Sequence, residues 1–443
     1  MENYEYARLA ARTHKLIYIS KMGYYKYAGG VWKHLKEYDV INLIINAAGS
    51  DALGFPMRWY KAEAVYRELK PFCRKDAAFN KAPVFNFLNG TLELDTGTFR
   101  DARAKDYCTQ QAHYDYDPHA KAPGWEKFVS EIMLKDEQKI KLLQETAGYV
   151  LFSDCSLQKF FFFSGKAYNG AKTFLDVLEA VVMGADRLFP HSLTANELAT
   201  SINIRELKEP RLRIALYSSF MNRSNYSTSF GSEKSKSVFK HLVNGDAIDG
   251  HLAHEPYVPF TSRAKIFWKN NIFIPPKDVT QDLLTHMVYV AFNAVFVNDP
   301  NPNNPLEFKA DTDMKEKLLP ELPGIFNWVY EGYKRLKREG KFSVTEEHRR
   351  MIKKFKVMNN PAAEFVKDEI INNTSWRNEP RISRSAMYER YTAWCETSGV
   401  KNTLSQKEFT PIVREQLLKA RLLKREYISH GEKGFELDPG KYR

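Results

Sequence analysis

The chain has little cysteine and no long apolar run. Its four cysteines, Cys73, Cys108, Cys155 and Cys395, are far apart and form no Cys-x-x-Cys pair, so neither a zinc site nor a disulfide framework is expected. No stretch approaches the ~18 apolar residues of a membrane helix, and the N-terminus "MENYEYARLAARTHK" lacks the apolar core of a signal peptide. The sequence thus predicts a cytoplasmic protein.

Familiar catalytic signatures are also missing. The sequence contains no Gly-x-Ser-x-Gly elbow, no His-Glu-x-x-His pair and no EF-hand spacing. These absences argue against serine hydrolases of that type, zinc proteases and calcium-binding loops, and we predict no metal site.

Positive charge is what the sequence has in excess. Lys and Arg number 66 against 54 Asp and Glu, which gives a formal net charge of +12. Strongly basic stretches lie at 333–356 and 414–426. Solvated helix faces account for many such runs, yet together with the total charge they favour a polyanion, above all a nucleic acid, as partner.

The patterning predicts an α/β protein of five segments. Residues 1–75 form a small α+β unit, and 76–154 a strand-turn-strand unit followed by collar-like helices. Residues 155–300 form an α/β core, and 301–357 a basic helical lid or linker. Residues 358–443 read as helices followed by a hairpin around His430-Gly431, which predicts a winged-helix DNA-binding domain.

The α/β core contains a string that nearly spells a phosphate-binding loop. "LQKFFFFSG" predicts a buried strand, and "TFLDVLEAVVMG" predicts a helix whose N-terminus would face phosphate. Between them, Asn169-Gly170 is followed by Ala171-Lys172-Thr173, whereas a P-loop ends in Gly-Lys-Ser/Thr. Two further buried strands are expected over 211–220 and 263–271.

Several stretches together resemble one known family. "NFLNGTLELDTG", "HYDYDPHAKAPGWEKFVSEI", "LLQETAGYVLF", "ELPGIFNWVYEGYKRLKREGKFSV" and "RISRSAMYERYTAWCETSGVKNTLSQKEF" occur in the order found in phage and plasmid primase-helicases of the poxvirus type, in helicase superfamily 3. The resemblance runs from about residue 20 to 440. It implies a hexameric, ring-forming AAA+-related ATPase that moves single-stranded DNA, and it makes "HYDYDPH" (113–119) a capped turn rather than a metal cluster.

The family's nucleotide loop can be aligned in two ways. Without a gap, the matching residues are Gly165, Asn169, Gly170, Thr173 and Phe174. Ala171 then takes the place of the lysine, and Lys172 that of the serine. A shift by one residue would instead make Lys172 and Thr173 the lysine and hydroxyl pair. We favour the gapless alignment, because one inserted residue would rotate the following helix by about 100°.

The other motor motifs implied by the resemblance are mostly altered. Ser218 and Ser219 stand where an acidic pair would hold Mg²⁺ and orient water. Asn271, or else Asn270, takes the place of the sensor asparagine, although an Asn-rich turn explains it equally well. His286 stands where the family has an arginine that reaches the neighbouring subunit's nucleotide.

The resemblance also indicates DNA contacts. "FKHLVNGDAIDGHLAHEPYVPFTSRAK" (239–265) matches the hairpin that projects into the ring channel, with His251, His254 and Arg263. Both histidines are equally well explained as surface or packing residues. In the terminal domain the expected phosphate contacts are Arg381, Arg384, Lys401 and Lys407.

Three functions remain open at this stage. The favoured one is a DNA-binding replication protein of the superfamily 3 type with impaired or absent ATPase. An active 3′-to-5′ helicase using Lys172, Thr173, ATP and Mg²⁺ is the second, and an inert scaffold or inhibitor without a cofactor is the third. Expected partners are single-stranded or origin DNA, further copies of the chain in a homo-hexamer, and replication proteins such as a separate primase or polymerase. If a phage or mobile element encodes the protein, we expect it in the cytoplasm of the bacterial host.

Overall fold

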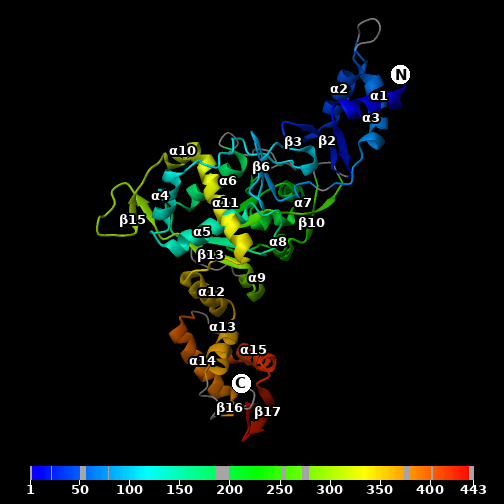
Figure 1. Ribbon diagram of the computed structural model, residues 1–443. Coiled ribbons are helices and arrows are strands. Elements are labelled where there is room, and N and C mark those ends of the chain that lie inside the picture. The colour runs from blue at the N-terminus through cyan, green and yellow to red at the C-terminus, as the bar shows by residue number, and fades with distance from the viewer. Residues whose placement is uncertain are drawn as a thin grey trace. The chain divides into compact units, whose positions relative to one another are not determined.

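The computed structural model describes residues 2–20, 22–49, 56–77, 79–184, 199–251, 256–271, 279–373, 380–400 and 403–438 (Figure 1). The chain divides into unit 1, residues 1–276 and 286–345, and unit 2, residues 277–285 and 346–443. The finer division into five segments stays a prediction. Within the described residues, no helix is long and apolar enough to cross a membrane.

Unit 1 begins with the small α+β part that the sequence predicts. Helices α1 (Asn3–Thr13), α2 (Glu37–Ala48) and α3 (Trp59–Cys73) pack on one another. The antiparallel strands are β1 (Leu16–Ile19), β2 (Gly23–Ala28) and β3 (Val31–Leu35). Buried Ala7, Ala10, Val40, Ile44 and Val65 recur at helical spacing, which explains why these stretches form amphipathic helices.

The next part confirms the strand-turn-strand signal. Strands β4 (Val84–Phe87), β5 (Gly90–Glu93) and β6 (Phe99–Arg100) form an antiparallel sheet. Helices α4 (Pro123–Ile132) and α5 (Glu137–Tyr149) follow, and Asp136 caps α5 by accepting hydrogen bonds from Gln138 N and Lys139 N. In the "HYDYDPH" stretch, the Asp117 carboxylate accepts from His119 N at 2.9 Å, which confirms the capped turn.

A five-stranded parallel sheet forms the centre of unit 1, so the α/β fold class is confirmed. Its strand order is β13 (Met287–Ala291), β7 (Phe160–Ser164), β12 (Lys265–Asn270), β9 (Met221–Asn225) and β8 (Ala199–Thr200). The predicted strand 263–271 is thus present as β12.

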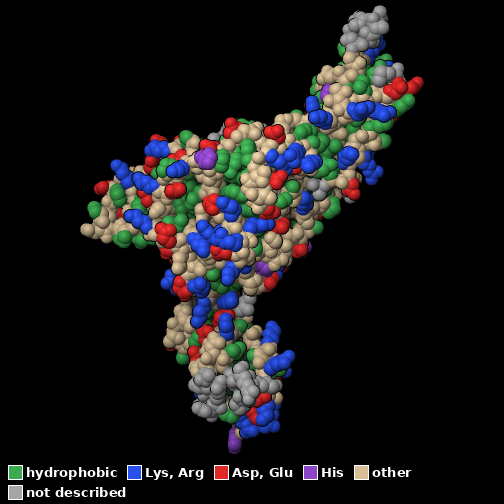
Figure 2. All heavy atoms as spheres, viewed as in Figure 1, with side chains coloured by type: hydrophobic (Ala, Val, Ile, Leu, Met, Phe, Trp, Pro, Cys, Tyr) green, Lys and Arg blue, Asp and Glu red, His purple; other side chains and the backbone are tan. Residues whose placement is uncertain are grey.

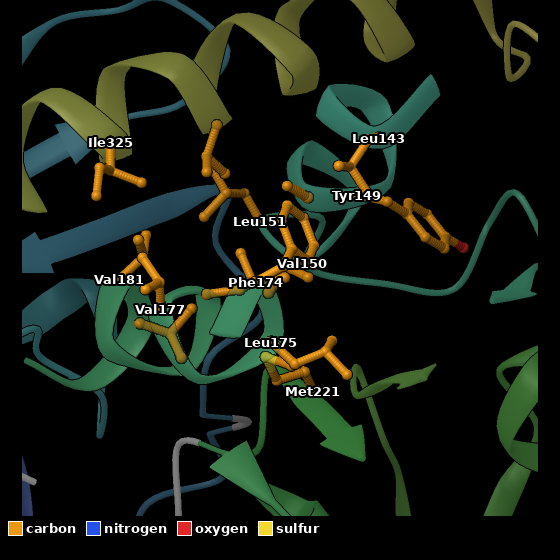
Figure 3. Close-up of a cluster of buried hydrophobic side chains, with 14 of the residues drawn as sticks. Leu143, Tyr149, Val150, Leu151, Phe174, Leu175, Val177, Val181, Met221 and Ile325 are labelled. Carbon is orange, nitrogen blue, oxygen red and sulfur yellow. The ribbon is translucent and has the colours of Figure 1, made fainter. Parts of the chain in front are cut away.

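Both faces of this sheet are covered, which explains the uninterrupted Phe run of β7. Phe161 and Phe163 belong to a large apolar core with α6 (Ala171–Met183). Phe160 packs on the other side against Phe239 of α8 (Glu233–Asn244), with ring centroids 5.0 Å apart. Figure 3 shows the first core: Phe174, Val177 and Val181 of α6 lie opposite Ile325 of α11 (Leu322–Glu339).

The prediction of a strand over 211–220 is wrong. Residues 204–208 and 210–217 are helical instead, with 3-10 turns Ile204–Lys208 and Ile214–Tyr217 around α7 (Pro210–Arg213). Pro210 occupies the first turn of α7, where its missing N–H has no cost. The apolar alternation of "RLRIALY" is therefore misleading, and the strand begins only at Met221 as β9.

The remaining elements of unit 1 are short. Between β9 and β12 a hairpin of β10 (Ala247–Gly250) and β11 (Val258–Thr261) is present, as the sequence predicts. After β13 come β14 (Val295–Val297), β15 (Glu307–Lys309) and α10 (Met314–Leu318). Helix α9 (Gln281–His286) precedes β13, and all of it but His286 belongs to unit 2.

Unit 2 runs from helices into a hairpin. Its elements are α12 (Glu346–Asn359), α13 (Pro361–Phe365), a π-helical stretch (Val366–Ile371), β16 (Arg381–Ser383), α14 (Arg384–Ser398), α15 (Gln406–Lys419), β17 (Leu423–Ser429) and β18 (Glu432–Leu437). Strands pair antiparallel in the order β16-β18-β17. The rings of Tyr391 and Phe409 stack with their centroids 4.3 Å apart and Trp394 is also buried, so these aromatics are core residues.

Candidate functional site

The loop between β7 and α6, residues 165–170, lies at the carboxyl end of a central strand. A Cβ on Gly165 would lie 2.1 Å from the Phe292 carbonyl oxygen, so no other residue fits there without a shift of backbone. Gly170 has φ +80° and is the N-cap of α6, and a Cβ on it would lie 2.3 Å from Ile132 Cγ2. The two glycines therefore set the shape of this loop.

The start of α6 decides which residue follows the loop. Ala171 is the first helical residue and is 1% exposed. Lys172 comes second, its side chain is 72% exposed, and its Nζ lies 2.6 Å from Asp176 Oδ2 one turn along the helix. Lys172 thus bonds along α6 and not back toward the loop. Thr173 is partly buried.

Asp176 and Glu179 form an ionic cluster with Arg223 of β9. Arg223 Nη1 lies 2.6 Å from Asp176 Oδ1, and its Nη2 lies 3.3 Å from Glu179 Oε2. Burial tends to raise the pKa of Asp176, but hydrogen bonds from Arg223 and Lys172 hold it below the usual value. Burial outweighs Arg223 at the other carboxyl and raises the pKa of Glu179 to about 7.

No carboxylate lies on β9, whose sequence is Met-Asn-Arg-Ser-Asn. Its carboxyl end presents Ser224 and Asn225. Ser224 Oγ accepts a hydrogen bond from Ile204 N at 3.0 Å, and Asn222 bonds Ile202 through both amide atoms. The polar side chains of this strand therefore hold the neighbouring segment in place.

Ser218 and Ser219 lie before β9, at the wrong end of the strand for the role the alignment gave them. Both are fully buried, and Ser219 Oγ donates to the Ala215 carbonyl at 2.9 Å as part of the helical turn. The position at the carboxyl end of the strand belongs to Ser224 and Asn225, neither of which is acidic.

The end of β12 carries the candidate sensor asparagines. Asn270 is buried and donates to the Ser227 carbonyl at 3.4 Å, while Asn271 follows the last residue of the strand. Lys269 is also buried, with its Nζ 3.3 Å from the Tyr226 hydroxyl. His286 ends α9, and its Nδ1 lies 2.8 Å from the Gln158 carbonyl oxygen.

Of the hairpin residues, His251 and Arg263 fall in the described part of the chain. The rings of His251 and Tyr257 lie 4.5 Å apart. Arg263 is 5% exposed and donates to Gln110 Oε1 and the Leu151 carbonyl, so it is not presented to DNA here. His254, predicted to contact DNA, lies outside the described residues, as does Lys401 of the terminal domain.

Unit 2 gathers exposed cations around two carboxylates of its sheet. Glu436 binds Arg381 at 3.0 Å, Lys424 at 3.0 Å and Arg425 at 2.9 Å. Hydrogen bonds from Lys424, Arg425 and Arg381 lower the pKa of Glu436 to about 2. The three cationic side chains are each 58–60% exposed.

The second carboxylate, Glu426, binds Arg384 and also Arg414 at 2.5 Å. We name these five cations and two carboxylates the wing cluster: Arg381, Arg384, Arg414, Lys424, Arg425, Glu426 and Glu436. It has three more positive than negative charges. The structure thus brings Arg381 and Arg384 together, whereas Lys407 is exposed at the start of α15 without a part in the cluster.

Lys and Arg side chains also gather on unit 1 over the last turns of α11 (Figure 2). Lys337 and Arg338 lie in that last turn, and they pair with Asp95 and Glu339. Because acids lie among these cations, the excess of charge here is smaller than the basic sequence 333–356 suggests.

Sequence reasoning missed Asp176, Glu179 and Arg223 in unit 1, and Arg414, Lys424 and Arg425 in unit 2. The sequence held a signal for Asp176 and Glu179, because they lie with Lys172 on one helical face at i, i+4 and i+7. The sequence held no signal for Arg223, because its partners lie about 45 residues earlier in the chain.

Comparisons with known proteins identify two segments. Residues 5–134 match the family model "D5 N terminal like", and residues 358–433 match "Poxvirus D5 protein-like". No curated protein matches the chain.

Among solved structures, the chain is similar to the apo NrS-1 C-terminal region. One such structure has a TM-score of 0.56 at 10% identity, with 99% of this chain and 100% of that chain covered. Another has a TM-score of 0.54 at 11% identity, with 99% of each chain covered. At this identity the likeness shows the fold.

Proposed function

We propose that this chain, which matches D5 family models over residues 5–134 and 358–433 and resembles the phage and poxvirus type of primase-helicase, binds DNA during replication with a motor core that hydrolyses ATP poorly or not at all. The observation that carries this proposal is the start of α6. Buried Ala171 occupies the place of the phosphate-binding lysine, and Lys172 is engaged by Asp176.

The core fits a degenerate AAA+-related P-loop domain. The loop 165–170 has the Gly-x-x-x-x-Gly spacing, follows a buried strand and begins a helix, which is the context in which backbone N–H groups cradle phosphates. It also lies where the chain order of the sheet reverses, because β7 has the later strands β12 and β13 on its two sides. What this frame lacks is a lysine directly after Gly170, where Ala171 stands, and a carboxylate for Mg²⁺ on β9.

We expect ATP hydrolysis by the purified protein to stay at background level, with or without single-stranded DNA and Mg²⁺. Lys172→Ala should change nothing, because Lys172 only pairs with Asp176 on the helix surface. The measurement is phosphate release over time, with Lys166→Ala as a matched control that removes a loop lysine outside the lysine position.

DNA-stimulated turnover that Lys172→Ala abolishes and Lys166→Ala spares would contradict this proposal. It would favour the active 3′-to-5′ helicase, with the loop aligned one residue further along and ATP and Mg²⁺ as cofactors. An inert scaffold is distinguished by the absence of DNA binding together with the absence of turnover.

DNA binding is assigned to unit 2. Its order of helix, strand, two helices and hairpin is that of a winged helix, in which α15 would be the helix that enters the groove. The wing cluster adds exposed positive charge on the strands beside it. Assembly into a ring of identical chains is part of the same proposal, as the resemblance implies.

Loss of Lys407 or Lys424 should weaken DNA binding in a salt-dependent way. Each alanine variant is expected to lower the slope of log affinity against log salt by about one, because each removes one phosphate contact. Fluorescence anisotropy with a duplex at several salt concentrations measures this. Lys317→Ala is the control, since it removes a cation of unit 1 that pairs with Asp311. Equal slopes for all three variants would contradict the assignment.

A further inference from the structure

A cavity of unit 1 lies away from the loop 165–170. Its volume is about 410 Å³, within the range typical of small-molecule sites. Tyr217 lines it shortly before β9, and Arg263 lines it shortly before β12, so it lies at the amino ends of these strands. The loop 165–170 follows the carboxyl end of β7. We call this cavity the amino-end pocket.

The walls of the amino-end pocket are largely apolar and aromatic. Ile19 and Met22 come from the N-terminal α+β part, and Phe79 from the connection that follows it. Tyr217 and Phe260 come from the core, and their rings meet edge to face at 5.5 Å. Such walls suit the flat π-face of a nucleobase.

Among the residues that the structure describes, two cations and no acid line the pocket. Lys81 stands at the surface, with its Nζ 2.7 Å from Thr261 Oγ1. Arg263 is 5% exposed, and its hydrogen bonds run to the amide oxygen of Gln110 and the carbonyl of Leu151, both neutral. Its buried Nε has no hydrogen-bond partner. The hydrogen bonds of this buried guanidinium go only to neutral groups, and its Nε–H has no acceptor. Such a group favours the binding of an anion.

The surroundings of Arg263 also favour the binding of an anion. Lys265, also buried, bonds only the carbonyls of Phe152 and Arg263, so two buried cations lie together. Burial lowers the pKa of Arg263 to about 10 and that of Lys265 to about 8. The charged form of each side chain is therefore destabilised, because no carboxylate is bonded to either. Asp154 acts on both from a distance.

We propose that the amino-end pocket binds a nucleotide, with its phosphate on Arg263 and Lys81 and its base between the aromatic walls. The ligand is either a free mononucleotide or the phosphorylated end of a DNA strand, since both have the same chemistry. The proposal is independent of the motor loop, because the loop lies at the opposite end of the sheet.

The test is calorimetric titration of the full chain with AMP, and with a short oligothymidylate with and without a 5′-phosphate. Saturable binding of AMP or of the phosphorylated strand is expected. Lys81→Ala should weaken it about tenfold, because a charge-assisted hydrogen bond is lost. Ala247→Trp should abolish binding by filling the pocket from an exposed position. Lys75→Ala, an exposed cation outside the lining, should bind normally.

Binding of AMP alone identifies a free nucleotide as the ligand, and binding that requires the 5′-phosphate on DNA identifies a strand end. Arg263→Gln should weaken the binding of AMP and of the phosphorylated strand. Circular dichroism shows whether this variant folds. If it does not fold, the Lys81→Ala and Ala247→Trp variants test the proposal. No saturable binding of any probe, or binding that Ala247→Trp and Lys81→Ala leave unchanged, would overturn the proposal. Neither result bears on ATP hydrolysis at the motor loop.

Discussion

Replacing Gly332 by alanine is expected to destabilise unit 1 by about 3 kcal/mol. A Cβ on Gly332 of α11 would lie 2.1 Å from the Gln144 carbonyl oxygen of α5, and one on Gly148 would lie 2.2 Å from Tyr333 N. The helices therefore touch backbone to backbone at these glycines, and no side-chain rotation can relieve the clash. Thermal unfolding followed by circular dichroism should show a loss of several degrees.

The neighbouring variant Glu331→Ala controls for this effect. Glu331 is exposed and pairs with Lys334 on the same helix, so its loss should change stability by less than about 0.5 kcal/mol. Equal melting temperatures for Gly332→Ala and Glu331→Ala would show that α5 and α11 separate easily. Since α11 also packs on α6, that result would weaken the view of a rigid support behind the loop 165–170.

The elements that sequence patterns predicted well are those whose packing repeats locally. The four phenylalanines of β7 form an apolar run because both faces of the sheet are covered, and such a run is visible without knowing the partners. The hairpin of β17 and β18 was found for a similar reason, since its turn at His430-Gly431 requires positive φ at both residues.

Strand β9 could not be recognised, because its stability comes from distant partners. Asn222 and Ser224 are fully buried, yet they are polar and satisfy backbone groups of the segment that follows β8. The stretch before it looked like a strand, but Arg213 is buried there through hydrogen bonds to Asp249 and to the carbonyls of residues 207 and 208. A local pattern contains none of these pairings.

The same division holds for the candidate site: features set by local spacing could be predicted, and features set by distant partners could not. Spacing alone predicted a helix after the loop glycines, and α6 does begin directly after Gly170. The role of Lys172 does not, because its bond to Asp176 competes with any bond to phosphate and depends on how Arg223 shares that carboxylate. Arg263 was expected at a DNA surface and is buried beside a pocket instead.

The ionic cluster of α6 should make stability depend on pH through Glu179. In the folded chain the pKa of Glu179 is about 7, against 4.5 for an ordinary glutamate. The unfolded chain therefore loses this proton near pH 4.5, while the folded chain keeps it up to about pH 7. Between these values the folded state binds more protons, so this group makes unfolding easier as pH rises, by about 3 kcal/mol in all.

Glu179→Gln removes that proton exchange and keeps the shape of the side chain. The variant should unfold like the natural protein near pH 4.5 and should be more stable at pH 8, by up to about 3 kcal/mol, because the natural protein then carries a buried charge that Arg223 already shares with Asp176. Thermal unfolding across this pH range measures the difference. Glu233→Gln, an exposed change on α8, should show no such trend. A variant less stable than the natural protein at pH 8 would mean that the Arg223 pair outweighs burial, and that Glu179 is ionised in the folded chain well below pH 7.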